Sequence, residues 1–85
     1  MHSCGFIQFM NTAIEVGKNV KGALGREGWS QTRAAEALGM SRVVFSHRVN
    51  GRTSFTVAEL QNLADALGVS YSSLVEVPEW VVNAR

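Results

Sequence analysis

Apolar positions recur at helical spacing in several segments of this 85-residue chain, and residues that start or stop helices bound each segment. The clearest segment is 57–67, whose apolar stripe consists of Val57, Leu60, Leu63, Ala64 and Leu67. Immediately before it, Thr56-Val57-Ala58-Glu59 has the form of a capping box, and Gly68 is a good C-terminal stop. The pattern predicts a helix from Val57 to Leu67.

A similar capping box, Thr12-Ala13-Ile14-Glu15, predicts the start of the first helix at Thr12. Val16, Val20 and Leu24 continue its apolar spacing, and Gly28 can end it. Two glycines inside this segment, Gly17 and Gly22, lower its intrinsic helix propensity.

Three shorter helices are predicted from serine caps. Ser30 caps residues 31–38, which Gly39 closes, and Ser41 caps residues 42–49, which Asn50-Gly51 end. Ser70 caps a last helix that ends near Val75, before Pro78. The fold class expected is therefore all-α, with five helices joined by short loops.

The two ends of the chain are apolar without a clear helical period. We expect an N-terminal arm over residues 1–11, a compact domain over 12–75 and a C-terminal tail over 76–85 that could mediate dimerisation. The β-branched and aromatic residues of both ends would also suit short strands or extended arms. Packing on the domain itself or on a second copy is favoured over binding a different protein. The residues proposed for this surface are Phe6, Phe9, Trp80, Val81 and Val82.

Charge is distributed unevenly, although the net charge is only +1. Residues 18–52 contain seven basic and two acidic side chains, a local net charge of +5, while residues 53–84 contain four acidic side chains and no lysine or arginine. A chain of this kind can present one basic face to the phosphates of a nucleic acid.

Other classes of function have little support in the sequence. Cys4 is the only cysteine, so neither an intramolecular disulfide nor a zinc site of cysteines and histidines is expected. Two histidines and scattered carboxylates offer no catalytic constellation, so we expect no enzyme, no cofactor, no bound metal and no small-molecule substrate. The chain lacks an apolar run of membrane-spanning length and a signal peptide, which predicts a cytoplasmic protein with no membrane partner.

A family resemblance rests on the small, turn and apolar positions between residues 20 and 75. They include Trp29-Ser30-Gln31, Ala34-Ala35, Leu38-Gly39-Met40-Ser41, Phe45, Asn50-Gly51, Leu60, Leu63-Ala64, Leu67-Gly68-Val69-Ser70 and Leu74. This series resembles the phage repressor and Cro type of helix-turn-helix protein, also called the XRE or lambda-repressor-like family. Physically, a small Ala35 lets two helices cross closely, Gly39 permits a left-handed turn, and Phe45 anchors the following helix.

The resemblance implies that the helix from Arg42 to Val49 enters the major groove of double-stranded DNA. Base reading would then fall on Arg42, Val43, Ser46 and His47. Arginine can bind guanine O6 and N7, and valine can pack on a thymine methyl group. Contacts to phosphates, which position the protein without reading sequence, would come from Ser30, Gln31, Ser41, Arg48, Asn50, Arg52 and Thr53.

The chain departs from the family pattern in three ways, at four positions. Leu24 and Val49 replace a pair of opposite charges, and an apolar pair can do so without loss of stability. Arg48 stands where an apolar or aromatic side chain is usual, and Phe55 stands where proline is common.

The function that the resemblance implies is that of a transcriptional regulator of the Cro or small-repressor kind. It would act as a homodimer on a palindromic operator, with recognition helices about 34 Å apart. The alternative is an antitoxin-like or adaptor-like module of the same fold, whose main partner is another protein. A protein-binding module would rely on the apolar ends rather than on the basic segment.

Overall fold

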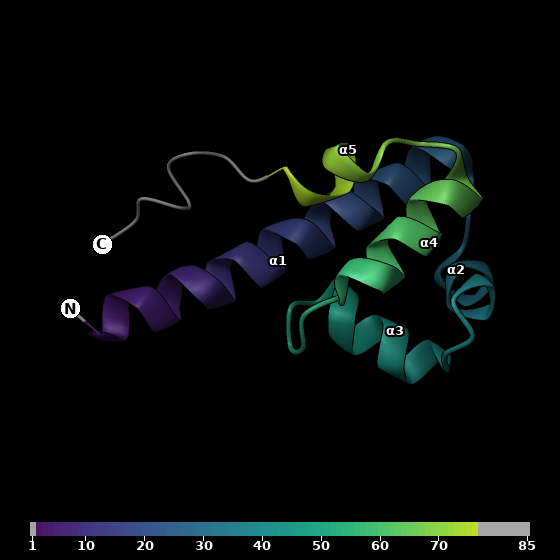
Figure 1. Ribbon diagram of the computed structural model, residues 1–85. Helices are drawn as coiled ribbons and strands as arrows, with labels where there is room; N and C mark the ends of the chain where they lie inside the picture. Colours follow the sequence, from purple (N-terminus) through teal and green to yellow (C-terminus); the bar gives the residue numbers. More distant parts are fainter. Residues whose placement is uncertain (1, 77–85) are drawn as a thin grey trace.

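The computed structural model describes the backbone of residues 2–76 and the side chains of Thr12 to Glu76. This part of the chain forms five α-helices and no strand (Figure 1). In order they are α1 (His2–Glu27), α2 (Gln31–Ala37), α3 (Arg42–Val49), α4 (Val57–Leu67) and α5 (Tyr71–Val75). The predicted all-α fold class is confirmed.

The start of α1 differs from the prediction. The helix begins at His2, ten residues before the predicted start at Thr12, and its N-terminal part extends past the other helices (Figure 1). Residues 6–9 lie within α1, so the alternative of a strand there is wrong. The segment before Thr12 contains no proline, and a capping-box sequence sets a boundary only where the preceding residue leaves the helix. The division into an arm, a domain and a tail stays a prediction.

The other helix ends agree with the sequence to within one residue, since α2 ends at Ala37 instead of the predicted Leu38. The hydroxyl oxygens of Ser30, Ser41 and Ser70 accept hydrogen bonds from the backbone amide three residues ahead, at 3.1–3.3 Å. Thr56 and Glu59 form the predicted capping box, with each side chain bound to the other residue's backbone amide. At the C-terminal side, Gly68 has a φ of 74°, as a left-handed stop requires.

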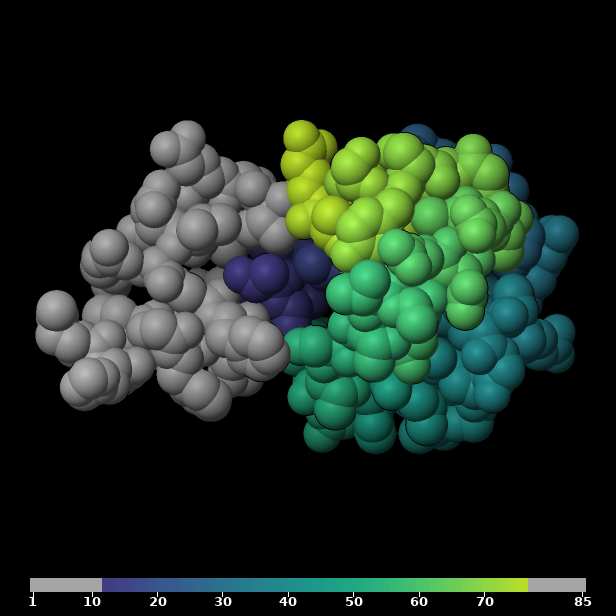
Figure 2. Space-filling model, viewed as in Figure 1, coloured from purple at the N-terminus to yellow at the C-terminus, as the bar shows by residue number. Residues whose placement is uncertain are grey.

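The hydrophobic core lies where all five helices of the described chain meet. Its largest fully buried side chains are Phe45, Leu63, Leu74, Val20 and Val49, and no polar side chain among those described is buried. Leu24 and Val49 are 3% and 2% exposed, which confirms that the two apolar residues at the usual positions of an ion pair belong to the core. In Figure 2, α4 and α5 cover much of α1 from this side, and part of α1 remains visible beside the loop before α4.

Gly17 shows why α1 tolerates a glycine in its interior. A Cβ at this position would overlap the backbone carbonyl of Val49 in α3. The two helix backbones therefore approach each other directly, and only a residue without a side chain fits between them. The sequence revealed only the cost of Gly17 to helix propensity, because its partner lies 32 residues away in the chain.

The described residues end at Glu76. Asn19 of α1 holds this end through its Nδ2 group, which donates to the carbonyl oxygens of Leu74 at 3.1 Å and Glu76 at 2.6 Å. Trp80, Val81 and Val82, which we assigned to a dimer or partner surface, lie outside the described residues. Phe6 and Phe9, which we assigned to the same surface, lie in α1, where the structure describes their backbone only.

Candidate nucleic-acid interface

The turn between α2 and α3 has the geometry that its sequence predicts. Gly39 has a φ of 70°, and the Met40 amide donates to the carbonyl of Ala35 at 3.0 Å. Ala34 and Ala35 are 0% and 1% exposed, so small side chains lie where α2 meets the rest of the domain. The result is a pair of short helices in which α2 packs against α3.

One side of α3 carries all four predicted base-reading residues. They line an open hollow of about 240 Å³, made by Arg42, Val43, Ser46, His47, Asn50 and Arg52. No acidic residue is among these six, and two of them are arginines. Val43 is 65% exposed, so this apolar side chain is available for contact with a partner.

Asn50 and Arg52, the other two residues that line the hollow, are positioned by hydrogen bonds at the end of α3. Asn50 Nδ2 donates to Ser46 Oγ at 3.3 Å. The backbone amides of Arg52 and Thr53 donate to the carbonyl of His47 at 2.9 and 3.4 Å. The loop after α3 therefore starts from a fixed position, with Arg52 beside the predicted base-reading residues.

At the N-termini of α2 and α3, the predicted phosphate-binding serines act as helix caps. Ser30 and Ser41 are exposed, and their hydroxyl oxygens accept from the amides of Arg33 and Val44. A serine hydroxyl that accepts in this way still has its own hydrogen to donate, so capping and phosphate binding are compatible. Gln31, at the first position of α2, is half-buried.

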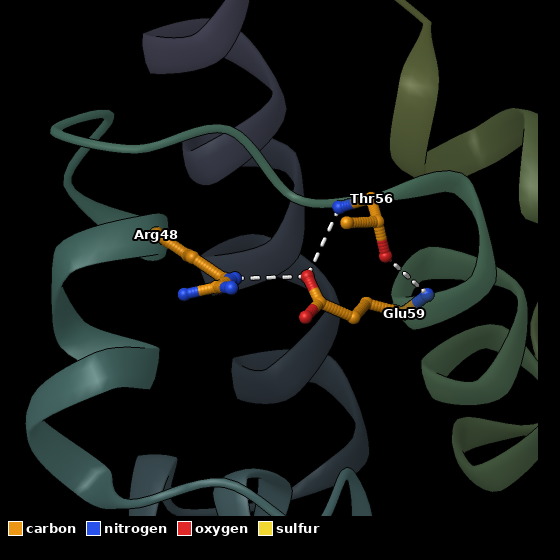
Figure 3. A network of polar contacts seen from close by, with 3 residues as sticks. All are labelled: Arg48, Thr56 and Glu59. Atoms are coloured by element: carbon orange, nitrogen blue, oxygen red, sulfur yellow. Dashed lines mark hydrogen bonds and ion pairs between the residues drawn. The ribbon is translucent and has the colours of Figure 1, made fainter.

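Arg48 is directed differently from the other predicted phosphate contacts. Its Nε donates to Glu59 Oε1 at 2.8 Å, and the side chains of the pair are 22% and 21% exposed (Figure 3). Arg48 does not line the hollow that Arg42, Val43, Ser46 and His47 share. Its contact with a phosphate stays a prediction, and it would have to use guanidinium nitrogens other than Nε.

Glu59 is the centre of this polar network. The same oxygen that binds Arg48 also accepts from the Thr56 amide at 2.9 Å (Figure 3). Partial burial by itself raises the pKa of Glu59, but the hydrogen bonds from Thr56 and Arg48 and the charge of Arg48 outweigh burial and leave the pKa below its ordinary value. Glu59 therefore remains a carboxylate, and its link to Arg48 is charge-assisted.

Two aromatic contacts were not anticipated. The Arg33 guanidinium lies 4.0 Å from the centre of the Trp29 ring. Phe55 packs edge-on against Phe45 with ring centres 5.7 Å apart. The phenylalanine at the usual position of proline thus fixes the loop before α4 through the core instead of through a restricted backbone.

Comparison with known families agrees with this geometry. The family model described as Helix-turn-helix matches residues 21–74, which include α2, the turn and α3. The chain therefore belongs to this helix-turn-helix family, a class of DNA-binding domains.

One characterised relative is an HTH-type transcriptional regulator, SutR, from Escherichia coli strain K12. It is 35% identical over 54 residues, which are 64% of this chain and 30% of SutR. The chain thus matches less than a third of the relative's length. No solved structure matches significantly. Within residues 2–76, no helix has both the length and the apolar character needed to cross a membrane.

Proposed function

We propose that this protein is a non-enzymatic transcriptional regulator that binds a specific sequence of double-stranded DNA by placing α3 in the major groove. The observation that carries the proposal is the open hollow on α3, where Arg42, Val43, Ser46 and His47 lie together without an acidic neighbour in the lining. Major-groove recognition needs an exposed helix side of this kind, with donors and small apolar groups within reach of base edges.

Within this proposal, Arg42 reads a guanine through a bidentate contact. Val43 packs on a thymine methyl group, while Ser46 and His47 bind further base edges. Arg42 lies in the first turn of α3, where residues of a recognition helix contact base edges. A good bidentate pair contributes about 1–3 kcal/mol of discrimination against the wrong base.

The phosphate contacts surround this reading side. Ser30, Gln31 and Ser41 belong to the N-termini of α2 and α3, where helix amides favour a negative charge. Asn50, Arg52 and Thr53 follow α3 directly, and Arg48 is the outlying member of the set. These contacts fix the register of the protein on the duplex without reading its sequence.

We further propose a homodimer on a palindromic operator, in the manner of Cro-like or small-repressor proteins of the phage-repressor type. A two-fold axis would place two copies of α3 about 34 Å apart, on successive turns of one face of the duplex. Light scattering coupled to size exclusion, with and without operator DNA, measures the stoichiometry. Monomer under both conditions would rule out the dimer.

The experiment that tests the function is selection of the purified protein against a random DNA library at about 150 mM salt, where nonspecific binding is weakened. Enrichment of a palindrome is the expected result, because each half-site meets one copy of α3. Enrichment of an unpaired site would retain the DNA-binding function and remove the dimer. Failure to enrich any sequence would contradict the proposal and favour a protein-binding module.

A further inference from the structure

The loop between α3 and α4 is closed at its base by the network of Arg48, Glu59 and Thr56 (Figure 3). Arg48 lies in the last turn of α3, and Thr56 is the N-cap of α4. One carboxylate oxygen of Glu59 binds both sides, at 2.8 Å to Arg48 Nε and 2.9 Å to the Thr56 amide. The residues enclosed by this link include Arg52 and Thr53, both proposed phosphate contacts.

The network holds α3 next to its buried side. Phe45 and Val49 bury the side of α3 that packs against α1 and α2, and Arg48 lies beside that side on the helix surface. On the flank that faces α4, the Arg48–Glu59 pair is the direct polar link among the described residues. Gly51 against Ile14 and Phe55 against Phe45 attach the loop to the core, so the pair would set only the finer position of the last turn of α3 and of Arg52 relative to α4.

We infer that Glu59 is a positioning residue for DNA binding. It acts through Arg48, fixing the end of α3 and the loop that carries Arg52 and Thr53, and it does not touch the DNA. The inference rests on the proposed function. It assigns to an acidic residue a favourable effect on binding a polyanion, which is the opposite of what charge alone predicts.

The sign of the effect makes the inference testable. Removal of a carboxylate from a DNA-binding protein normally strengthens binding, because it removes repulsion from the phosphates. The variant Glu59→Gln keeps the side-chain length and an oxygen that can accept from Thr56, but it loses the charge that binds Arg48. If Glu59 positions the loop, this variant binds the selected operator about three- to tenfold more weakly.

The matched control is Asp65→Asn, which removes an exposed carboxylate from the same helix. It should leave the operator Kd unchanged or lower it slightly. Fluorescence anisotropy gives both affinities, at a temperature where circular dichroism shows that all variants are folded. Equal or tighter binding by Glu59→Gln would overturn the inference.

A second variant tests whether Glu59 acts through Arg48. In an Arg48→Gln background, Glu59→Gln should have little further effect on the operator Kd, because the interaction through which it acts is already gone. An undiminished loss in that background would also overturn the inference. If the unchanged protein binds no DNA, the proposed function fails and this inference fails with it. Binding by the unchanged protein with undiminished binding by Glu59→Gln contradicts this inference alone.

Discussion

The two attachments of α3 differ in their chemistry. On the inner side, the backbone of Val49 lies against Gly17 of α1, and Phe45 is fully buried. On the outer side, Arg48 meets Glu59 through a charged hydrogen bond about one-fifth exposed to solvent. The contact between Gly17 and the Val49 backbone leaves no room for an added methyl group. The Arg48–Glu59 pair, in contrast, can be weakened by a substitution that causes no clash. Stability and orientation of the same eight-residue helix would therefore depend on two adjoining sides, and the side that carries Arg42 and Val43 is exposed to solvent.

The largest effect is expected on the inner side, from Gly17→Ala. The new methyl group meets a backbone carbonyl that cannot move aside, so α1 and α3 must separate. We expect a loss of about 3 kcal/mol in the free energy of unfolding, measured by urea denaturation. The control is Gly25→Ala in the same helix, where a Cβ meets nothing within 4 Å. That control should gain up to about 1 kcal/mol from helix propensity. Equal results for the two variants would show that the α1–α3 contact is looser than described.

A smaller loss is expected where the chain leaves α3. In Gly51→Ala, the alanine must keep a backbone φ of 78°, and its Cβ would lie 2.6 Å from Ile14 Cγ1. Gly68→Ala imposes a φ of 74° with open space around the Cβ. We expect about 1 kcal/mol for Gly68→Ala from backbone strain alone and about 2 kcal/mol for Gly51→Ala. The difference between their unfolding free energies measures the packing of this loop on α1, and no difference would refute that packing.

On the outer side, the effect should depend on pH. Because the pKa of Glu59 is lowered in the folded protein, its contribution to stability is present above the pKa of the unfolded chain and disappears as the pH falls through the folded value. Glu59→Gln should therefore cost about 1 kcal/mol at pH 7, and this cost should shrink as the medium is acidified towards pH 3.

Glu15→Gln provides the comparison for this titration. Glu15 binds Lys18 at 3.2 Å, but the lysine is 66% exposed. Removal of so exposed a pair should cost only about 0.3 kcal/mol. Thermal denaturation of the unchanged protein and of both variants at several pH values gives the stability cost of each substitution as a function of pH. A cost for Glu59→Gln that does not change with pH would exclude the ion pair as its origin.

The smallest effect on stability is expected on the exposed side that carries Arg42 and Val43. Arg42→Ala should change the free energy of unfolding by less than about 0.5 kcal/mol, because the side chain is exposed. Its effect on DNA should be selective, with about 1–3 kcal/mol lost on the selected operator and relaxed preference at one base pair. Arg52→Ala should weaken binding to all sequences and reduce the salt dependence. Equal losses on operator and random DNA for Arg42→Ala would contradict its role as a base reader.

Most helix boundaries could be predicted because their causes are local. Ser30, Ser41, Thr56 and Ser70 cap helices through hydrogen bonds that reach only three residues ahead. The same kind of signal failed at Thr12, since a threonine and a glutamate three residues apart occur inside helices as well. Whether such a pair starts a helix depends on the residues before it, and α1 continues through them to His2.

The exposed side shared by the predicted base-reading residues was also predictable, because residues that share one side of a helix follow from its periodicity. Arg42, Val43, Ser46 and His47 line one hollow as expected. The direction of Arg48 was not predictable, because its partner Glu59 belongs to another helix. No local rule indicates which acidic residue a basic side chain will meet across a loop.

The sequence by itself determined the helix-turn-helix class, four of the five helix starts and the exposed face of α3, since all of these depend on interactions within a few residues. Only the tertiary structure decided that Gly17 admits the backbone of α3, that Phe55 packs on Phe45, and that Glu59 joins α3 to α4. These contacts connect residues 10 to 32 positions apart. They are set by how the helices pack, because packing, and not local propensity, determines which distant side chains share the same space.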